Sequence, residues 1–196
     1  MNDELIDFFQ RSVAARSSMA QQLTPEIALA CQALAKSLLG HGRIFVCGDA
    51  ETVAIAQLMA SQLITRYEFD RPSLPAHCLN DNALLESTLR RYLEPNQRYS
   101  HMLRSLGSPG DMLVLFTVGE ILTSHTALIE SAHEKGIPVI FCHTQNLDPD
   151  QLDLIQELDH DLLLPGPSKA IALDSLLFLS QTFNALIDHH LFGSEF

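Results

Sequence analysis

Short apolar runs alternate with longer segments of helical spacing over most of the chain. Runs without polar alternation, such as residues 44–47, are typical of strands covered on both faces in a parallel sheet. The strands predicted in this way are 44–47, 76–79, 112–117, 137–142 and 162–164. The predicted helices run from Ala50 onward, after a cap at Asn80 or Asp81, from Thr123 or Ser124 to Lys135, and from Lys169, after the cap Ser168, to about His190. This alternation predicts an α/β fold with a five-stranded, parallel, doubly wound sheet.

Two helices are expected before the first strand. Asn2 or Asp3 can cap a helix that runs to about residue 22, and Thr24-Pro25 is suited to start a second helix, which Gly40 ends. Both helices carry apolar positions outside the alternation of strands and helices, so a helical bundle between subunits would bury them. We therefore expect a single domain, with a helical pair at 1–40 and an α/β core at 41–196.

Composition and charge narrow the choice of partners and compartment. The chain has 196 residues, 46% apolar content and a formal net charge of −12, which opposes direct binding to nucleic acid. It shows no long apolar run that predicts a membrane span, and its acidic start, MNDELIDFFQ, is unlike a signal peptide, so we expect a cytoplasmic protein. The four cysteines lie far apart in apolar runs without a CxxC pair, so we expect buried thiols, no metal site and no cofactor.

The turn after the first strand, from Gly48 to Val53, carries the first candidate chemistry. Its sequence, GDAETV, lacks the GxGxxG of a dinucleotide site, and Asp49 and Glu51 place two carboxylates where a phosphate would bind. The turn at 117–122, TVGEIL, repeats this pattern with Glu120. Both turns are therefore predicted to exclude anions. Their carboxylates would cap helices or, alternatively, bind a cation or a basic peptide.

Several motifs resemble the sugar isomerase (SIS) domain family, in particular its phosphoheptose isomerase branch. They are Cys47-Gly48, Ala56-Gln57, the RPSLPA segment at 71–76, Gly110-Asp111 and the long final helix. The resemblance covers nearly the whole chain. It implies a five-stranded, parallel, flavodoxin-like sheet between helices, and homotetramers formed through the long helices.

The same resemblance implies a degenerate sugar-phosphate site. Family isomerases carry GNGGSA at the first turn and a serine-rich run at the second, where only Thr52 and Thr117 keep hydroxyl groups. The family's catalytic glutamate falls on Ser61, and its glutamine and histidine fall on Ala172 and Ser175. Without these groups no acid or base for an aldose–ketose isomerisation is evident, so we expect no enzymatic activity. The degenerate ligand pocket would comprise Gly48, Asp49, Glu51, Thr52, Thr117 and Glu120.

A non-catalytic branch of the family, the DnaA initiator-associating (DiaA-type) proteins, implies a different function. The segment ALIDHHLF at 185–192 resembles the end of those proteins, including a Leu-Phe pair implicated in contacting DnaA that falls on Leu191 and Phe192. The resemblance implies a homotetrameric, non-enzymatic adaptor that holds several DnaA molecules at the chromosomal origin without touching DNA or a membrane. The alternatives are that the pair packs in a subunit interface, and that the protein is a sugar-phosphate isomerase or a sugar-phosphate sensor.

Overall fold

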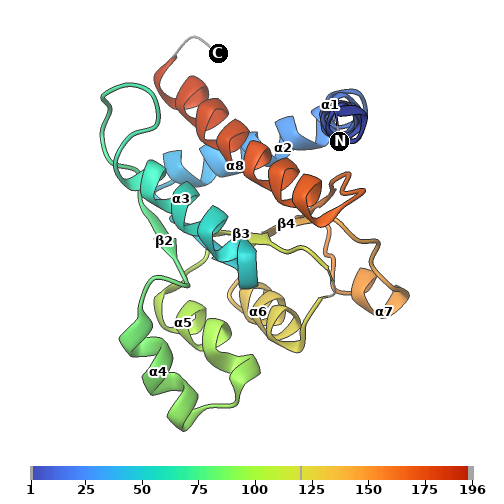
Figure 1. The fold of residues 1–196 in the computed structure, drawn as a ribbon. Coiled ribbons are helices and arrows are strands. Elements are labelled where there is room, and N and C mark those ends of the chain that lie inside the picture. Colours follow the sequence, from blue (N-terminus) through green and yellow to red (C-terminus); the bar gives the residue numbers. More distant parts are fainter. Residues whose placement is uncertain (1, 120, 194–196) are drawn as a thin grey trace.

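The fold has three layers, with one parallel sheet between two layers of helices (Figure 1). The structure is a computed structural model and describes residues 2–119 and 121–193. The strands are β1 (Ile44–Gly48), β2 (Ala76–Cys78), β3 (Met112–Phe116), β4 (Val139–His143) and β5 (His160–Leu163). The helices are α1 (Asn2–Gln22), α2 (Thr24–Leu39), α3 (Val53–Ile64), α4 (Ala83–Tyr92), α5 (Arg98–Leu106), α6 (Thr123–Glu134), α7 (Pro149–Leu152) and α8 (Lys169–Phe192), with 3-10 turns η1 (Ala50–Thr52) and η2 (Pro95–Gln97). The predicted α/β class and five-stranded parallel sheet are confirmed.

The strand order places β1 between β2 and β3. The order is β2-β1-β3-β4-β5, and all neighbours pair in parallel. Val46 of β1, for example, pairs with Cys78 of β2 on one side and with Val114 of β3 on the other. The chain thus moves outward from β1 to β2 and then continues on the other side of β1 as β3. In doubly wound sheets, ligands bind at such a switch point, outside the carboxyl ends of the strands.

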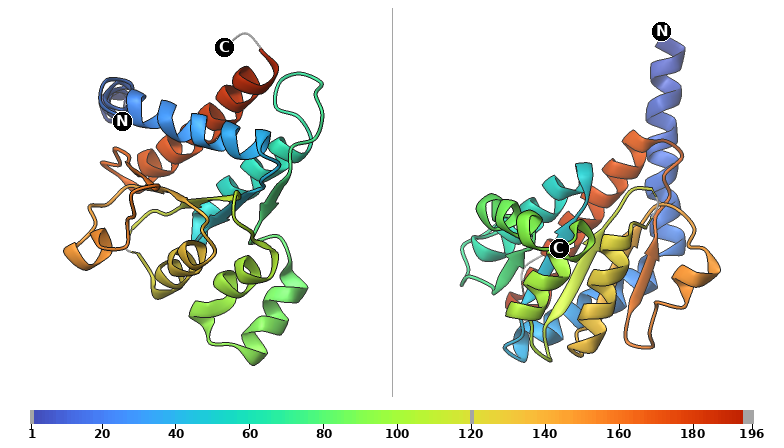
Figure 2. Two further views of the ribbon diagram at one scale, coloured as in Figure 1. Left: turned by 180° about the vertical axis from the view of Figure 1, so that it is seen from behind. Right: turned by 90° about the horizontal axis from the view of Figure 1, so that it is seen from below.

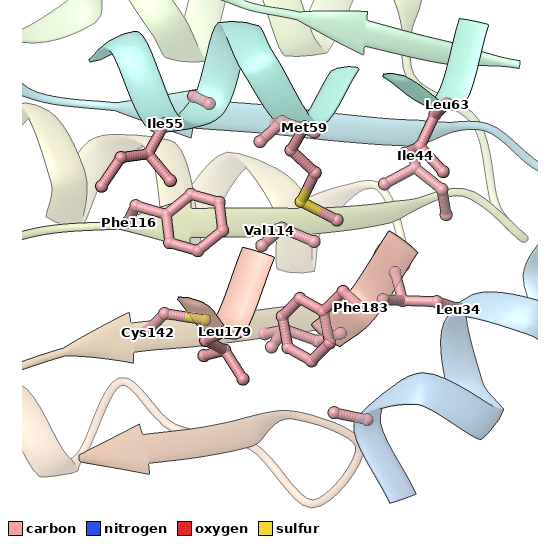
Figure 3. Packing of buried hydrophobic residues seen from close by; sticks show 14 of the residues in the cluster. Leu34, Ile44, Ile55, Met59, Leu63, Val114, Phe116, Cys142, Leu179 and Phe183 are labelled. Carbon is pink, nitrogen blue, oxygen red and sulfur yellow. The ribbon is translucent and has the colours of Figure 1, made fainter. Parts of the chain in front are cut away.

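Two layers of helices bury the sheet from opposite sides (Figure 2). Helices α2, α3 and α8 cover one face, and α4, α5 and α6 cover the other. Figure 3 shows the core of the first face, in which Phe183 of α8 lies beside Leu34 of α2, and Leu179 of α8 lies beside Cys142 of β4. By length and composition α8 could span a membrane, but it packs against α2 and α3 here. Its apolar character is therefore that of a core helix.

The starts of two helices confirm one expected cap and correct another. Ser168 caps α8, and its hydroxyl oxygen accepts the N–H of Ile171. Helix α4 is capped by Asn82, which accepts the N–H of Leu85 at 2.8 Å, so the expected cap at Asn80 or Asp81 is wrong. The side chain of Asn80 is directed to the end of β1 instead, where it contributes to the candidate site.

The four cysteines, Cys31, Cys47, Cys78 and Cys142, are buried and free, as predicted. Burial raises the pKa of Cys31 to about 12, and that of Cys78 to about 12 as well. These thiols therefore stay protonated at neutral pH and pack as small apolar groups.

Candidate functional site

A cavity of about 660 Å³ lies at the carboxyl ends of β1 and β3. Its wall contains Asp49 from the turn after β1, Asn96 and Arg98 from η2 and α5, and residues 121–124 from the loop before α6 and the first turn of that helix. Small-molecule sites typically measure roughly 300–1,000 Å³, so the volume suits a small ligand. The cavity thus brings a carboxylate, a guanidinium and two hydroxyl groups to the switch point of the sheet.

A chain of hydrogen bonds holds Arg98 at the wall of this cavity. The side chain of Asn80 accepts the N–H of Gly48 at 3.0 Å and donates to the carbonyl oxygen of Gly48 at 3.1 Å and to the Tyr99 hydroxyl at 3.0 Å. Arg98 donates to the same hydroxyl, and its guanidinium lies 4.3 Å from the centroid of the Tyr99 ring. The cation is therefore tied through Tyr99 and Asn80 to the end of β1.

Asp49 and His125 form a second polar pair at the cavity. Asp49 stands at the N-terminus of η1, but its side chain makes no capping hydrogen bond, and Oδ2 lies 3.8 Å from Nε2 of His125. His125 is fully buried in the first turn of α6, and its Nδ1 accepts the N–H of Leu122 at 3.2 Å. Burial lowers the pKa of His125, Asp49 opposes this shift and Arg98 adds to it. The imidazole is therefore neutral near pH 7.

The N-terminal end of α6 completes the cavity wall with the hydroxyl groups of Thr123 and Ser124. The N-cap residue is Leu122, whose side chain has no atom that can accept a hydrogen bond. Free N–H groups and the helix dipole at such an end favour an anion. Together with Arg98, this end of the cavity can hold a phosphate group. Within residues 2–119 and 121–193, no cluster of three or more His, Cys, Asp or Glu side chains could hold a metal ion.

Most residues expected to form the degenerate ligand pocket have structural roles. Gly48 is required because a Cβ at this position would lie 2.4 Å from the carbonyl oxygen of Thr52. The buried hydroxyl of Thr52 lies 2.8 Å from a carbonyl oxygen of β3 and so joins the turn to that strand. Thr117 is buried after β3, and its N–H donates to β4 at 3.0 Å. Asp49 lines the cavity, and Glu120 lies outside the described residues.

Glu51 lies beside a cation that the sequence pattern did not place there. Its carboxylate pairs with the ammonium group of Lys169 at the start of α8. The hydrogen bond from Lys169 is the main reason why the pKa of Glu51 is lowered. Lys169 therefore offsets part of the repulsion that the first turn was expected to exert on an anion, and Arg98 adds positive charge to the cavity.

The positions to which the resemblance assigns the family's catalytic groups, Ser61, Ala172 and Ser175, carry no acid or base. The Ser61 hydroxyl donates to a carbonyl oxygen of its own helix at 3.3 Å, and the Ser175 hydroxyl donates to the carbonyl oxygen of Pro165 at 3.0 Å. These residues lie on α3 and α8, which cover the face of the sheet opposite to α5 and α6. These three positions therefore supply no acid–base chemistry.

The Leu191-Phe192 pair, expected to contact a partner, packs within the chain. Leu191 is partly buried against the core. The Phe192 ring centroid lies 6.1 Å from that of Phe69 and 5.9 Å from the guanidinium carbon of Arg71. The pair therefore contributes to the packing of the C-terminal end of α8 against the rest of the chain, although the Phe192 side chain remains partly exposed.

Three residues of the site, Asn80, Arg98 and His125, were missed by the sequence-based prediction. Asn80 was expected only as a possible helix cap, and neither Arg98 nor His125 belongs to a recognised motif. One signal was available for His125, because the third residue of a helix often accepts the N–H of its cap residue. That signal predicts a local hydrogen bond and does not show which residue the other ring nitrogen faces.

The comparisons with known proteins agree on one family. Residues 7–141 match the SIS domain. A phosphoheptose isomerase from Chromohalobacter salexigens is 27% identical over 190 residues, which cover 97% of this chain and 96% of that protein. One from Methylococcus capsulatus is 27% identical over 188 residues, which cover 94% of each chain. The solved structure of a phosphoheptose isomerase from Francisella tularensis has a TM-score of 0.89 at 24% identity and covers 95% of this chain and 97% of its own, which shows the shared fold.

These comparisons overturn the expected function as a non-enzymatic adaptor for DnaA. Phosphoheptose isomerases match nearly the whole chain, so the similarity favours an enzyme and the isomerase alternative. The adaptor interpretation rested on the resemblance of the eight residues at 185–192 and on three missing side chains. The expectation that the chain is not an enzyme is therefore wrong.

Proposed function

Since the chain belongs to the SIS-domain family, we propose that it is a sugar-phosphate isomerase whose substrate binds in the cavity at the ends of β1 and β3. The observation that carries the proposal is the presence of Arg98 and the N-terminal end of α6 in one cavity at the switch point. A guanidinium and a helix N-terminus are both favourable partners for a phosphate. The relatives named phosphoheptose isomerase support a sugar as the remainder of the substrate. We place this activity in the cytoplasm.

The charged residues of the cavity determine the orientation in which the substrate binds. The phosphate belongs near Arg98 and the hydroxyl groups of Thr123 and Ser124, because these groups line the cavity and are able to donate hydrogen bonds to a phosphate. Asp49 repels the phosphate and therefore faces the uncharged sugar carbons. This arrangement puts a carboxylate beside the part of the substrate at which an isomerase moves a proton.

Replacing Arg98 with methionine is expected to weaken the binding of a sugar phosphate by roughly 10- to 100-fold, because a charge-assisted hydrogen bond typically contributes about 1.5–3 kcal/mol. Isothermal titration with sedoheptulose 7-phosphate measures the dissociation constant. A panel of pentose, hexose and heptose phosphates tested by thermal stabilisation identifies the preferred sugar. The unphosphorylated sugars should bind equally weakly to both proteins.

Arg104→Met is the matched control for this experiment. Arg104 lies on the same helix, α5, but its guanidinium pairs with Glu134 at 3.5 Å near the surface and does not line the cavity. The control should keep the affinity of the wild type. Equal affinities for Arg98→Met and wild type contradict the cavity as the phosphate site, and a wild type that binds no phosphorylated sugar contradicts the proposed function.

We also propose that the protein assembles as a homotetramer through α1. The first part of this helix extends beyond the body of the molecule (Figure 2). Its apolar residues Leu5, Ile6, Phe9 and Val13 are each at least 54% exposed. A second copy of the chain is the partner that we expect to cover this stripe, because two such apolar stripes are complementary to each other in an antiparallel or crossed pair of helices.

The variant Ile6→Glu/Phe9→Glu is expected to form a smaller assembly than the wild type, because it places charges in the proposed contact. Size-exclusion chromatography with light scattering measures the mass of both proteins at the same concentration. Glu4→Gln/Asp7→Asn changes the same helix without adding charge to its apolar side and serves as the control. A monomeric wild type at micromolar concentration contradicts the proposal.

A further inference from the structure

We propose that Asp49 is the catalytic residue that transfers the proton in this isomerisation, and that His125 positions its carboxylate. The assignment rests on the proposed function, which supplies the substrate. Asp49 is the one carboxylate among the described residues that line the cavity. Its side chain is 25% exposed, so the carboxylate is accessible to a bound sugar. Ser61 and Ser175, the positions to which the resemblance assigns the family's acid and base, hold no titratable group.

The turn after β1 orients Asp49 toward the cavity. The Asp49 N–H donates to the Thr52 hydroxyl oxygen at 2.7 Å, and the Asp49 carbonyl oxygen accepts the Thr52 N–H at 2.9 Å. Ala50 has a φ of 46°, in the left-handed region that residues other than glycine rarely adopt. The Asp49 side chain makes no capping hydrogen bond, although its position and type suit one. The backbone of this turn therefore leaves the Asp49 side chain in the wall of the cavity.

His125 presents a buried proton donor to that carboxylate. Because Nδ1 accepts the Leu122 N–H, the proton of the neutral ring lies on Nε2. Nε2 is buried without a hydrogen-bond partner among the described residues and lies 3.8 Å from Oδ2 of Asp49. An unsatisfied buried donor is costly, so a shift of Asp49 by about 1 Å that closes this gap is favourable. His125 thereby holds the carboxylate against the first turn of α6.

The proton transfer balances without a further reactant. In the direction from aldose to ketose, the Asp49 carboxylate takes the proton from C2 of the open-chain sugar. The electrons of the C2–H bond form the second bond between C1 and C2, and the carbonyl π electrons move to O1. A proton passes from O2 to O1, the carbonyl group forms at C2, and C1 takes the proton back from Asp49. The carboxylate returns to its starting state.

Two other titratable groups that the structure describes at this end of the sheet, Glu51 and His143, pair with neighbours. Glu51 pairs with Lys169. His143 is buried at the end of β4, where Nε2 lies 2.6 Å from Oδ1 of Asp161 and Nδ1 lies 2.6 Å from the carbonyl oxygen of Gln145. Neither Glu51 nor His143 lines the cavity. Of these three groups, Asp49 is therefore the one in position to reach the sugar.

Asp49→Asn tests the assignment, because it keeps the shape of the side chain and removes the basic oxygen. With sedoheptulose 7-phosphate, kcat should fall by about 100-fold or more, the scale of general-base catalysis, while the dissociation constant changes by less than about threefold. Proton NMR in deuterated water should show that the wild type exchanges a proton at C1 and that the variant exchanges it at least 100-fold more slowly.

Two further variants separate catalysis from folding. Asp153→Asn changes an exposed aspartate after α7, outside the cavity, and should keep kcat. His125→Asn keeps an acceptor for the Leu122 N–H but removes the Nε2 donor, so kcat should fall by about tenfold and the acidic limb of its pH profile should move to higher pH. An active wild type with an equally active Asp49→Asn overturns the assignment but not the function. A wild type without exchange overturns both.

Discussion

Replacing Asp188 with alanine is expected to lower the free energy of unfolding by about 3–5 kcal/mol, the range for breaking a buried ion pair. The side chains of Arg71 and Asp188 are 1% and 2% exposed, and Nε of Arg71 donates to Oδ1 of Asp188 at 2.6 Å. The other guanidinium nitrogens donate to the carbonyl oxygens of Gln62, Leu63 and Pro72. The substitution leaves the positive charge of Arg71 buried among neutral groups. Urea unfolding at a fixed protein concentration measures the loss.

The intact Arg71–Asp188 pair is expected to contribute little more to the free energy of unfolding than apolar side chains of similar size would. Burial, with a further contribution from the charge of Glu68, raises the pKa of Asp188 even though Arg71 lowers it, so the attraction to Arg71 does not fully offset these unfavourable effects. The double variant Arg71→Met/Asp188→Leu should therefore regain most of the stability lost by Asp188→Ala. A double variant that loses the sum of the losses in Arg71→Met and Asp188→Leu contradicts this expectation, because additive losses indicate that the two residues do not interact.

The strands at the centre of the sheet could be predicted because they are buried along their whole length. All residues of β1, β3 and β4 are buried. The first and last residues of each strand differ by at most two positions from the range that its apolar run predicts. The edge strand β5 (His160–Leu163) has exposed and half-buried positions and begins two residues before the predicted range of 162–164. The other edge strand, β2 (Ala76–Cys78), agrees with its predicted range of 76–79 within one residue. The apolar pattern reports burial, so it locates the buried strands and misses the more exposed first half of β5.

Only part of the candidate site could be predicted, because its residues meet through the order of the strands. Asp49 follows a recognisable strand and turn. His125 faces it because β1 and β3 are neighbours in the sheet, and the apolar pattern does not specify which strands are neighbours. Arg98 depends on tertiary contacts in the same way, since Tyr99 and Asn80 connect it to Gly48.

The expectation that the chain is not an enzyme failed for a related reason. It depended on the positions to which the resemblance assigns the family's acid and base, and these positions hold Ser61 and Ser175. Proton transfer, however, requires a titratable group within reach of the substrate and does not depend on which element supplies it. Helices α3 and α8 supply none at those positions, whereas the turn after β1 places Asp49 in the cavity wall.

Replacing Phe183 with alanine is expected to cost about 3–5 kcal/mol of stability, because deleting a buried ring removes its transfer free energy and leaves a cavity. Phe183 is fully buried in the middle of α8 and belongs to the core that α8 forms with α2, α3 and the sheet (Figure 3). For a chain of this length the change corresponds to a fall in melting temperature of about 10 °C or more. Calorimetry and urea unfolding at one protein concentration measure both quantities.

Phe178→Ala on the same helix shows whether this loss comes from burial. The Phe178 side chain is 44% exposed, and the guanidinium carbon of Arg16 lies 4.9 Å from its ring centroid. Its replacement should cost only about 0.5–1 kcal/mol, the typical contribution of an exposed cation–π contact. Both variants replace the same residue type by the best helix former, so helix propensity changes equally in the two. Equal losses would therefore contradict the assignment of α8 as a core helix, whereas a loss several times larger for Phe183→Ala places its stabilising contacts on the side that faces the sheet.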